Sequence, residues 1–103
     1  MIIVYSIEGT PIRLTNERWD HIIRRHPELD SQKERVLETI NKPDFVQEGD
    51  LGDLLAIRQY LQTPLTTKYL VVVYKEVEKR EGFIITAYFA SQPSKRRKIK
   101  WKP

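Results

Sequence analysis

The pattern of apolar and polar positions changes its period near the middle of the chain. Over residues 16–41 the apolar side chains recur at the three- and four-residue spacing of amphipathic helices, and beyond residue 44 they alternate at the two-residue spacing of strands. Before the first helix, residues 2–7 have the composition of a strand, and Ile12 and Leu14 mark a second short extended segment. This order predicts an α+β domain in which the helices precede most of the sheet.

The first helix is predicted over residues 16–25. Thr15 suits the N-cap position, and Pro27 disfavours helical geometry in the residue before it. The apolar stripe that starts with Trp19 and Ile22 marks the face that we expect to pack against the core.

The second helix is predicted to end at about Asn41. It begins either with a capping box formed by Ser31 and Glu34 or directly after Asp30 as the N-cap. Strands are then predicted over residues 45–48, 54–61, 68–77 and 82–91. A loop is predicted over residues 62–67.

The connections between these strands are short, which favours antiparallel pairing. We expect the two N-terminal helices to cover one face of a mainly antiparallel sheet of four to five strands. Strict alternation places four apolar side chains on the covered face, those of Ile57, Ile85, Ala87 and Phe89. It places four polar or aromatic side chains on the opposite face, those of Arg58, Tyr60, Thr86 and Tyr88. A face of this second kind is suited to bind RNA.

Charge is distributed unevenly along the chain. Of the 18 Lys and Arg residues, six lie in residues 92–103, which contain no acid, so residues 1–91 keep 12 basic against all 14 acidic side chains. The body therefore has a net charge of −2 and the end of the chain one of +6. We divide the chain into a single domain over residues 1–91 and a basic C-terminal tail over residues 92–103. Such a tail either binds a polyanion or is simply solvated.

Composition excludes several classes of site. The 103 residues suffice for one domain, and the absence of cysteine excludes disulfides and thiolate metal sites. No metal-ligand spacing and no Gly-rich phosphate loop occurs, so we expect neither a metal nor a cofactor. The start of the chain lacks a basic segment followed by a long apolar run, so we expect a cytosolic protein without a signal peptide or membrane span.

The first candidate chemistry lies at the end of the first predicted helix. His21 and His26 are the only two histidines, and they bracket Arg24 and Arg25. A histidine beside fixed cations is a proton-transfer group beside permanent positive charge, which is the minimum for cleaving a phosphodiester without a metal. The alternative is structural: His26 caps the helix, His21 is a surface residue, and the arginines complement the helix dipole. Five residues apart, the histidines do not share a helix face.

The predicted strands carry the second group of candidates. Arg58 could stabilise a phosphate, or could form a cross-strand ion pair with Glu48 or Glu76. Thr86 and Tyr88 could orient a phosphate, or could be ordinary strand residues.

The basic tail and one strand residue form a candidate nucleic-acid surface. Its expected members are Lys68, Lys95, Arg96, Arg97, Lys98, Lys100 and Trp101. Trp101 could stack on a base while the cations meet phosphates; the alternative is a disordered end.

Four segments in this order resemble a known group of proteins. They are Arg18-Trp19-x-His21-Ile22-x-x-Arg25-His26-Pro27-Glu28, Pro43-Asp44-Phe45, Tyr69-Leu70-Val71-Val72-Val73 and Thr86-Ala87-Tyr88. They resemble the phage-associated and cyanobacterial branch of the barnase, EndoU, colicin and RelE-like metal-independent ribonucleases. The resemblance implies a RelE-like architecture. It also implies that a helix-borne histidine, His26 or His21, is the acid–base group, and that Thr86 and Tyr88 supply a strand hydroxyl near an aromatic ring.

We therefore expect a metal-independent endoribonuclease that is the toxin of a toxin–antitoxin pair, with RNA and an antitoxin protein as partners and no membrane. A histidine takes the proton of a ribose 2′-hydroxyl, whose oxygen attacks the adjacent phosphorus and leaves a 2′,3′-cyclic phosphate. Arg25 and Arg58 stabilise the phosphoryl charge, and the second histidine or Lys68 protonates the leaving oxygen. The alternative is a non-catalytic module that binds nucleic acid or an acidic protein partner.

Overall fold

One mixed β-sheet forms the frame of the molecule, which is described here by a computed structural model for residues 1–64 and 68–103. Within these residues the strands are β1 (Ile2–Tyr5), β2 (Pro11–Leu14), β3 (Phe45–Glu48), β4 (Leu54–Gln59), β5 (Tyr69–Glu78), β6 (Glu81–Ala90) and β7 (Ile99–Trp101). The helices are α1 (Asn16–Arg25), the short 3₁₀ helix η1 (Pro27–Leu29) and α2 (Lys33–Asn41). Residues 65–67 of the predicted 62–67 loop lie outside the described residues.

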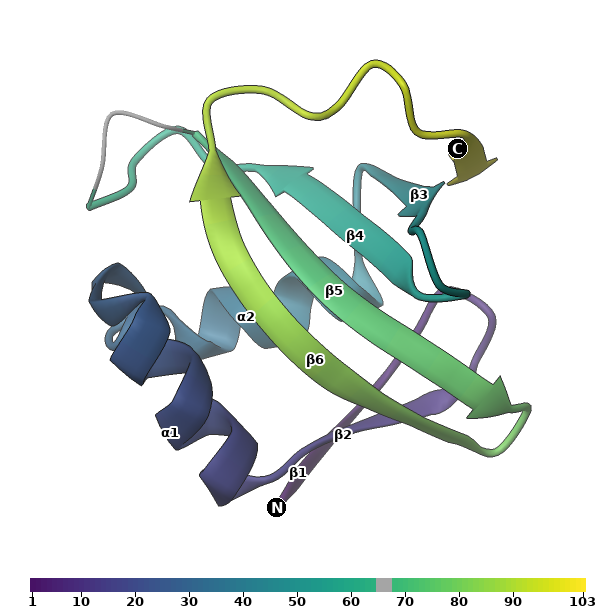
Figure 1. Ribbon diagram of the computed structural model, residues 1–103, viewed down its shortest axis with the longest axis horizontal. Helices are drawn as coiled ribbons and strands as arrows, with labels where there is room; N and C mark the ends of the chain where they lie inside the picture. The colour runs from purple at the N-terminus through teal and green to yellow at the C-terminus, as the bar shows by residue number, and fades with distance from the viewer. Residues whose placement is uncertain (65–67) are drawn as a thin grey trace.

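The sheet is larger than predicted and is not simply antiparallel. Its seven strands follow the order β1-β2-β6-β5-β4-β3-β7, and β2 runs parallel to β6 (Figure 1). The expected four- to five-stranded, mainly antiparallel sheet of RelE-like architecture is therefore wrong, although the chain does have both helices and strands of an α+β protein. The long connection from β2 through both helices and three strands permits the parallel pairing, which short hairpins do not.

Close approach of two backbones makes this parallel contact. Ile12 and Arg13 of β2 pair with Gly82 and Phe83 of β6. A Cβ atom at Gly82 would lie 2.7 Å from the Lys75 carbonyl oxygen of β5 and 2.5 Å from Ile12 Cδ1 of β2, so glycine leaves room for the β5 backbone on one side and the Ile12 side chain on the other. Beyond Phe83, no strand in the described residues pairs with this edge of β6.

The helices occupy different positions around the sheet. Helix α2 packs on β5, β4 and β1, whereas α1 lies beside β6, along the edge that β2 leaves open (Figure 1). The bounds of α1 match the prediction, and the Thr15 hydroxyl accepts a hydrogen bond from the Arg18 N–H at 3.1 Å. For α2 neither predicted cap forms: Gln32 occupies the N-cap position without a side-chain hydrogen bond, because η1 carries the chain directly into the helix. Among the described helices, none has both the length and the apolar character to cross a membrane.

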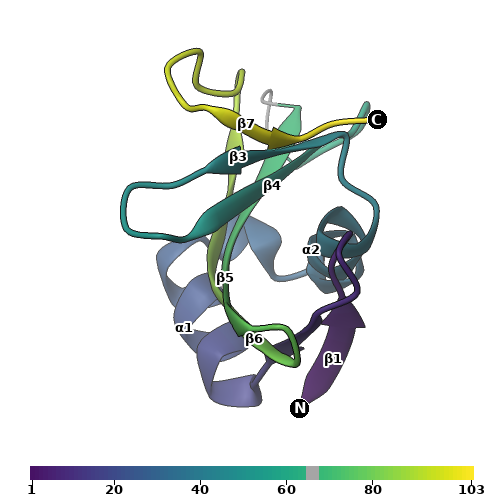
Figure 2. The same cartoon turned by 90° about the vertical axis from the view of Figure 1, so that its right-hand side faces the viewer.

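Two apolar clusters bury the sheet from opposite sides. The larger cluster joins the helices to the sheet and includes Trp19, Ile22, Val36, Ile40 and Tyr74. The smaller cluster lies on the other face and consists of Leu55, Ile57, Val71 and Val73, with partly buried neighbours. Residues 70–73 of β5 are covered on both faces, since all four are at most 9% exposed. The sheet curves so strongly that β3 and β7 extend across its end (Figure 2).

Strict alternation predicted the wrong face for several strand residues. In β4, Ala56 belongs to the helix-side cluster and Ile57 to the opposite one, so Arg58 points toward the helices rather than away from them. In β6 the pairing shifts from Tyr74–Ile84 to Val73–Thr86, which leaves Ile85 as an extra residue. Such a β-bulge reverses the alternation, so that Ile84 faces the helix-side core and Ile85 does not.

Candidate functional site

One face of α1 carries a row of basic side chains. Arg18, His21 and Arg25 lie at the i, i+3, i+7 spacing that places residues on the same side of a helix, and all three are exposed. This row borders the apolar positions that hold α1 on the core, so it faces the neighbouring edge of β6. Arg18 reaches that edge directly, because its Nη1 donates to the Ile85 carbonyl oxygen at 3.4 Å.

The bulge in β6 provides the opposite wall. Because Ile85 is an extra residue, Ile85 and Thr86 are both half-exposed, and Tyr88 follows on the same side. Together the two walls enclose an open cavity of about 540 Å³. Its lining residues are Arg18, His21, Arg25, His26, Ile85, Thr86 and Tyr88. We call this space the histidine cavity.

His26 enters the cavity from the residue that ends α1. Its φ of −133° and ψ of 74° are outside the helical region, although its N–H still donates to the Ile22 carbonyl oxygen at 2.8 Å. The 100° step of a helix therefore does not fix its direction, and both histidines line one cavity despite their spacing. The side chain is 32% exposed; its Nδ1 is 3.7 Å from Glu28 Oε2, and its ring centroid is 6.2 Å from that of Tyr88.

The electrostatic character of the histidine cavity is positive. Two guanidinium groups and two imidazoles line it, and none of the described lining residues is acidic. Within the described residues, His21 and Arg25 have no side-chain hydrogen bond or ion pair, so their donors are available to a ligand. An anion in this cavity would lie between permanent cations and next to groups that transfer protons near neutral pH.

Arg58 lies elsewhere, which corrects the predicted composite site. Its Nη1 donates to the Lys42 carbonyl oxygen at 2.6 Å, its Nε is 3.6 Å from Glu38 Oε1, and its guanidinium lies 5.6 Å from the Tyr60 ring centroid. These partners hold it against α2, on the helix side of the sheet. The expected cross-strand pairs with Glu48 or Glu76 also do not form; the acidic partner comes from α2 instead.

The histidine cavity therefore gathers five of the six predicted catalytic residues, namely His21, Arg25, His26, Thr86 and Tyr88. It adds Arg18 and Ile85, which were not predicted as site residues. The sequence does contain a signal for Arg18, because it lies three residues before His21 and therefore on the same face of the helix. No periodic signal in the sequence marks Ile85 as a site residue, because the β-bulge interrupts the two-residue alternation of β6.

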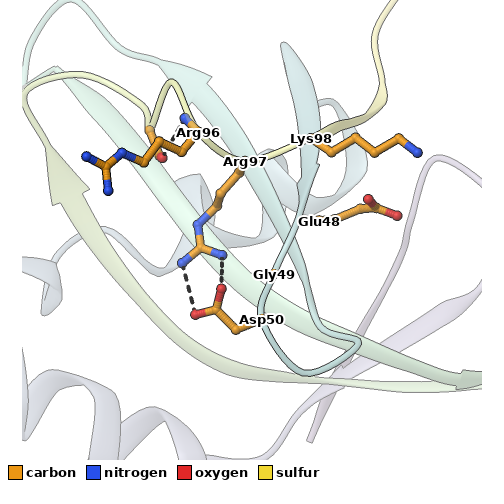
Figure 3. Close-up of a pocket in the computed structure, with 7 residues that line it drawn as sticks. Glu48, Gly49, Asp50, Arg96, Arg97 and Lys98 are labelled. Atoms are coloured by element: carbon orange, nitrogen blue, oxygen red, sulfur yellow. Dashed lines mark hydrogen bonds and ion pairs between the residues drawn. The ribbon is translucent and has the colours of Figure 1, made fainter.

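The basic tail is attached to the sheet. Arg97 donates from Nη1 and Nη2 to the two carboxylate oxygens of Asp50, at 2.9 and 3.4 Å, whereas Arg96 and Lys98 extend away from this pair (Figure 3). The hydrogen bond to Asp50 raises the pKa of Arg97 above its ordinary value. Trp101 lies in β7, opposite Val46 of β3. The remaining predicted nucleic-acid contacts, at Lys68, Lys95, Arg96, Lys98 and Lys100, are exposed.

Residues 1–64 and 68–103 contain no cluster of three or more His, Cys, Asp or Glu side chains that could hold a metal ion. Comparisons of the chain with protein-family models, with curated proteins and with solved structures find no match. The evidence for a function therefore comes from the histidine cavity itself.

Proposed function

We propose that this protein is a metal-independent endoribonuclease and that the histidine cavity is its active site. The observation that carries the proposal is the convergence of two imidazoles, two guanidinium groups and two hydroxyl-bearing side chains on one open hollow. Metal-free cleavage of RNA needs a cationic site for the phosphate and two proton-transfer groups around it.

Arg18 and Arg25 bind the scissile phosphate in this proposal. They lie two turns apart on the same helix face, so an RNA phosphate between them meets a guanidinium from either side. Guanidinium groups form paired, charge-assisted hydrogen bonds to phosphate oxygens, and these bonds strengthen as negative charge develops in the transition state.

The two histidines divide the proton transfers. His26 accepts the proton of the ribose 2′-hydroxyl, the 2′-oxygen bonds to phosphorus, and the bond from phosphorus to the 5′-oxygen breaks. His21 donates a proton to that leaving oxygen, so the products are a 2′,3′-cyclic phosphate and a 5′-hydroxyl. The choice of His26 as the base is supported by its neighbour, because the Glu28 carboxylate lies 3.7 Å from His26 Nδ1.

Thr86 and Tyr88 orient the phosphate. Neither hydroxyl makes a hydrogen bond within the described part of the chain, so each is available to donate to a phosphoryl oxygen. The bulge supports this role, because it turns a strand hydroxyl toward the helix at the edge of the sheet.

The decisive experiment is cleavage of a short RNA by the purified protein in excess chelator. The expected products carry 2′,3′-cyclic phosphate ends by mass spectrometry, and an RNA with 2′-deoxyribose at the cleavage position stays intact. His26→Ala lowers the rate about a hundredfold or more. Arg24→Ala is the matched control, because Arg24 is exposed on the same helix and does not line the cavity. Cleavage that requires magnesium would reject the mechanism.

The biological role that we propose is that of a cytoplasmic toxin held inactive by an antitoxin protein. The resemblance of the sequence motifs supports this role, and the exposed cations of the tail offer a surface to an acidic antitoxin. Induced expression should stop growth and leave RNA fragments with cyclic phosphate ends, and the His26→Ala protein should do neither. If the unchanged protein and His26→Ala both stop growth, the toxicity does not arise from RNA cleavage at this site.

A second candidate function is RNA binding without catalysis. The exposed lysines and arginine of the tail favour it, since they form an electrostatic surface apart from the histidine cavity. Its signature is salt-sensitive binding with no products, which is lost when the tail cations are replaced.

A further inference from the structure

A second cavity lies next to the histidine cavity, on the face of the sheet away from α2. It has a volume of about 310 Å³, and its floor is formed by the smaller apolar cluster, from Leu55, Ile57 and Val71. Residues 92–94 of the tail form the wall opposite this floor. Tyr88 lines both cavities, so one aromatic side chain separates the two hollows.

Gln47 of β3 is the buried polar group of this second cavity. The side chain is only 2% exposed, and its Nε2 donates to the Ser94 carbonyl oxygen at 2.8 Å. Its Oε1 is buried and has no hydrogen-bond partner among the described residues. Buried acceptors in native proteins are almost always paired with a protein or water donor, so an unpaired one beside a hollow is a position that a donor from a ligand can complete.

The charged group at this cavity is already engaged. Arg97 lines the hollow, but both of its terminal nitrogens bind Asp50. The cavity therefore offers an apolar floor, an aromatic edge and one buried carbonyl acceptor, with no free charge from Arg97, while Gln92 and Ser94 of the tail add exposed polar groups to its lining.

We propose that this second cavity binds the base of the nucleotide whose 3′-phosphate occupies the histidine cavity, and that it prefers a base with an exocyclic amino group. The proposal rests on the proposed function, because it deepens the description of the same substrate. A flat, apolar ring fits between the floor and Tyr88, and stacking on aromatic side chains is the usual way in which proteins hold unpaired bases. The volume is at the lower end of the range of about 300–1,000 Å³ for small-molecule sites, which suits one ring system.

The buried, unpaired acceptor determines the preference. Adenine, cytosine and guanine each present an amino group that can donate to Gln47 Oε1. Uracil has no amino group, and its one ring N–H lies between two carbonyl oxygens, so it reaches an acceptor less well than an amino group that projects from the ring. Loss of one neutral hydrogen bond corresponds to a roughly three- to tenfold weaker binding constant.

The test is binding of 3′-AMP, 3′-CMP, 3′-UMP and inorganic phosphate to the full chain, measured by titration calorimetry. We expect 3′-AMP and 3′-CMP to bind roughly three- to tenfold more tightly than 3′-UMP. Gln47→Leu should abolish this difference and leave phosphate binding unchanged. Gln59→Leu is the control, because Gln59 is exposed on the neighbouring strand β4 and lines neither cavity.

The outcomes distinguish this proposal from the proposed function. If phosphate binds but the three nucleotides bind equally, the base site is refuted while the anion site stands. If Gln47→Leu keeps the full preference for amino-bearing bases, Gln47 is not its source and the proposal is also refuted. If phosphate itself does not bind, the proposed function fails and takes the base site with it. If Gln47→Leu does not fold, Gln47→Met takes its place. The order in which the unchanged protein binds the three nucleotides then still tests the proposal.

Discussion

Replacing Arg18 by alanine tests the proposed active site at a lining residue that the sequence analysis did not predict. Arg18 is exposed, and the hydrogen bond of its side chain, from Nη1 to the Ile85 carbonyl oxygen, is 3.4 Å long and therefore weak. The substitution should change the free energy of unfolding by less than about 0.5 kcal/mol, the usual range for an exposed position. A thermal melt should accordingly remain close to that of the unchanged protein.

The effect on cleavage should be much larger. A hydrogen bond from a charged donor to the phosphate contributes about 1.5–3 kcal/mol. If that bond is formed mainly in the transition state, its loss lowers the single-turnover rate about 10- to 150-fold. Arg18→Lys keeps the charge but not the planar pair of donors, so it should recover only part of the rate.

The assay is single-turnover cleavage of a fluorogenic oligoribonucleotide, with Arg24→Ala measured beside it. Both alanine variants remove one positive charge from the same helix, but only Arg18 lines the histidine cavity. A general effect of net charge would slow both equally and would weaken with added salt. Equal rates for Arg18→Ala and Arg24→Ala would refute the role of Arg18.

Three further predictions follow from the surrounding structure. Arg58→Ala should lower the free energy of unfolding by about 1–2 kcal/mol, because its hydrogen bond and its contact with Tyr60 are lost, and should leave cleavage unchanged. Burial raises the pKa of Tyr60 to about 12 and also raises the pKa of Tyr74. The unfolded chain therefore loses these protons first, so stability should fall as pH rises from about 10, and Tyr60→Phe should reduce this loss in alkaline melts. Removing residues 99–103 should lower the melting temperature, because β7 pairs with β3; an unchanged melt would contradict this pairing.

Local signals in the sequence predict the elements that depend on neighbouring residues. Thr15 and Pro27 determine where α1 begins and ends, and Trp19 and Ile22 determine which face it buries. The two histidines and Arg25 could be singled out because they share this helix end. The site that they form requires only α1 and one neighbouring strand, so its prediction did not depend on the order of the other strands.

Features that depend on distant contacts could not be predicted in this way. The parallel contact of β2 with β6 and the bulge at Ile85 arise from pairing between segments far apart in the chain. The face of Arg58 was ambiguous, because β4 is apolar on both sides and both sides of the sheet are covered. Strand β7 alternates apolar and polar residues, but its three residues are fewer than the roughly four to eight over which such alternation indicates a strand.

The order of the strands leaves β1 and β7 at the two margins of the sheet, where a foreign strand could attach. β1 exposes Ile3 and Tyr5, at 50% and 56%, and is the margin more open to self-association. β7 is short and carries Lys100, with Lys98 just before it, and such charge discourages pairing with another molecule. Neutralising these lysines would remove that protection together with any affinity for phosphate. Replacing both lysines by glutamate is the better change, because glutamate repels phosphate and keeps this margin of the sheet charged.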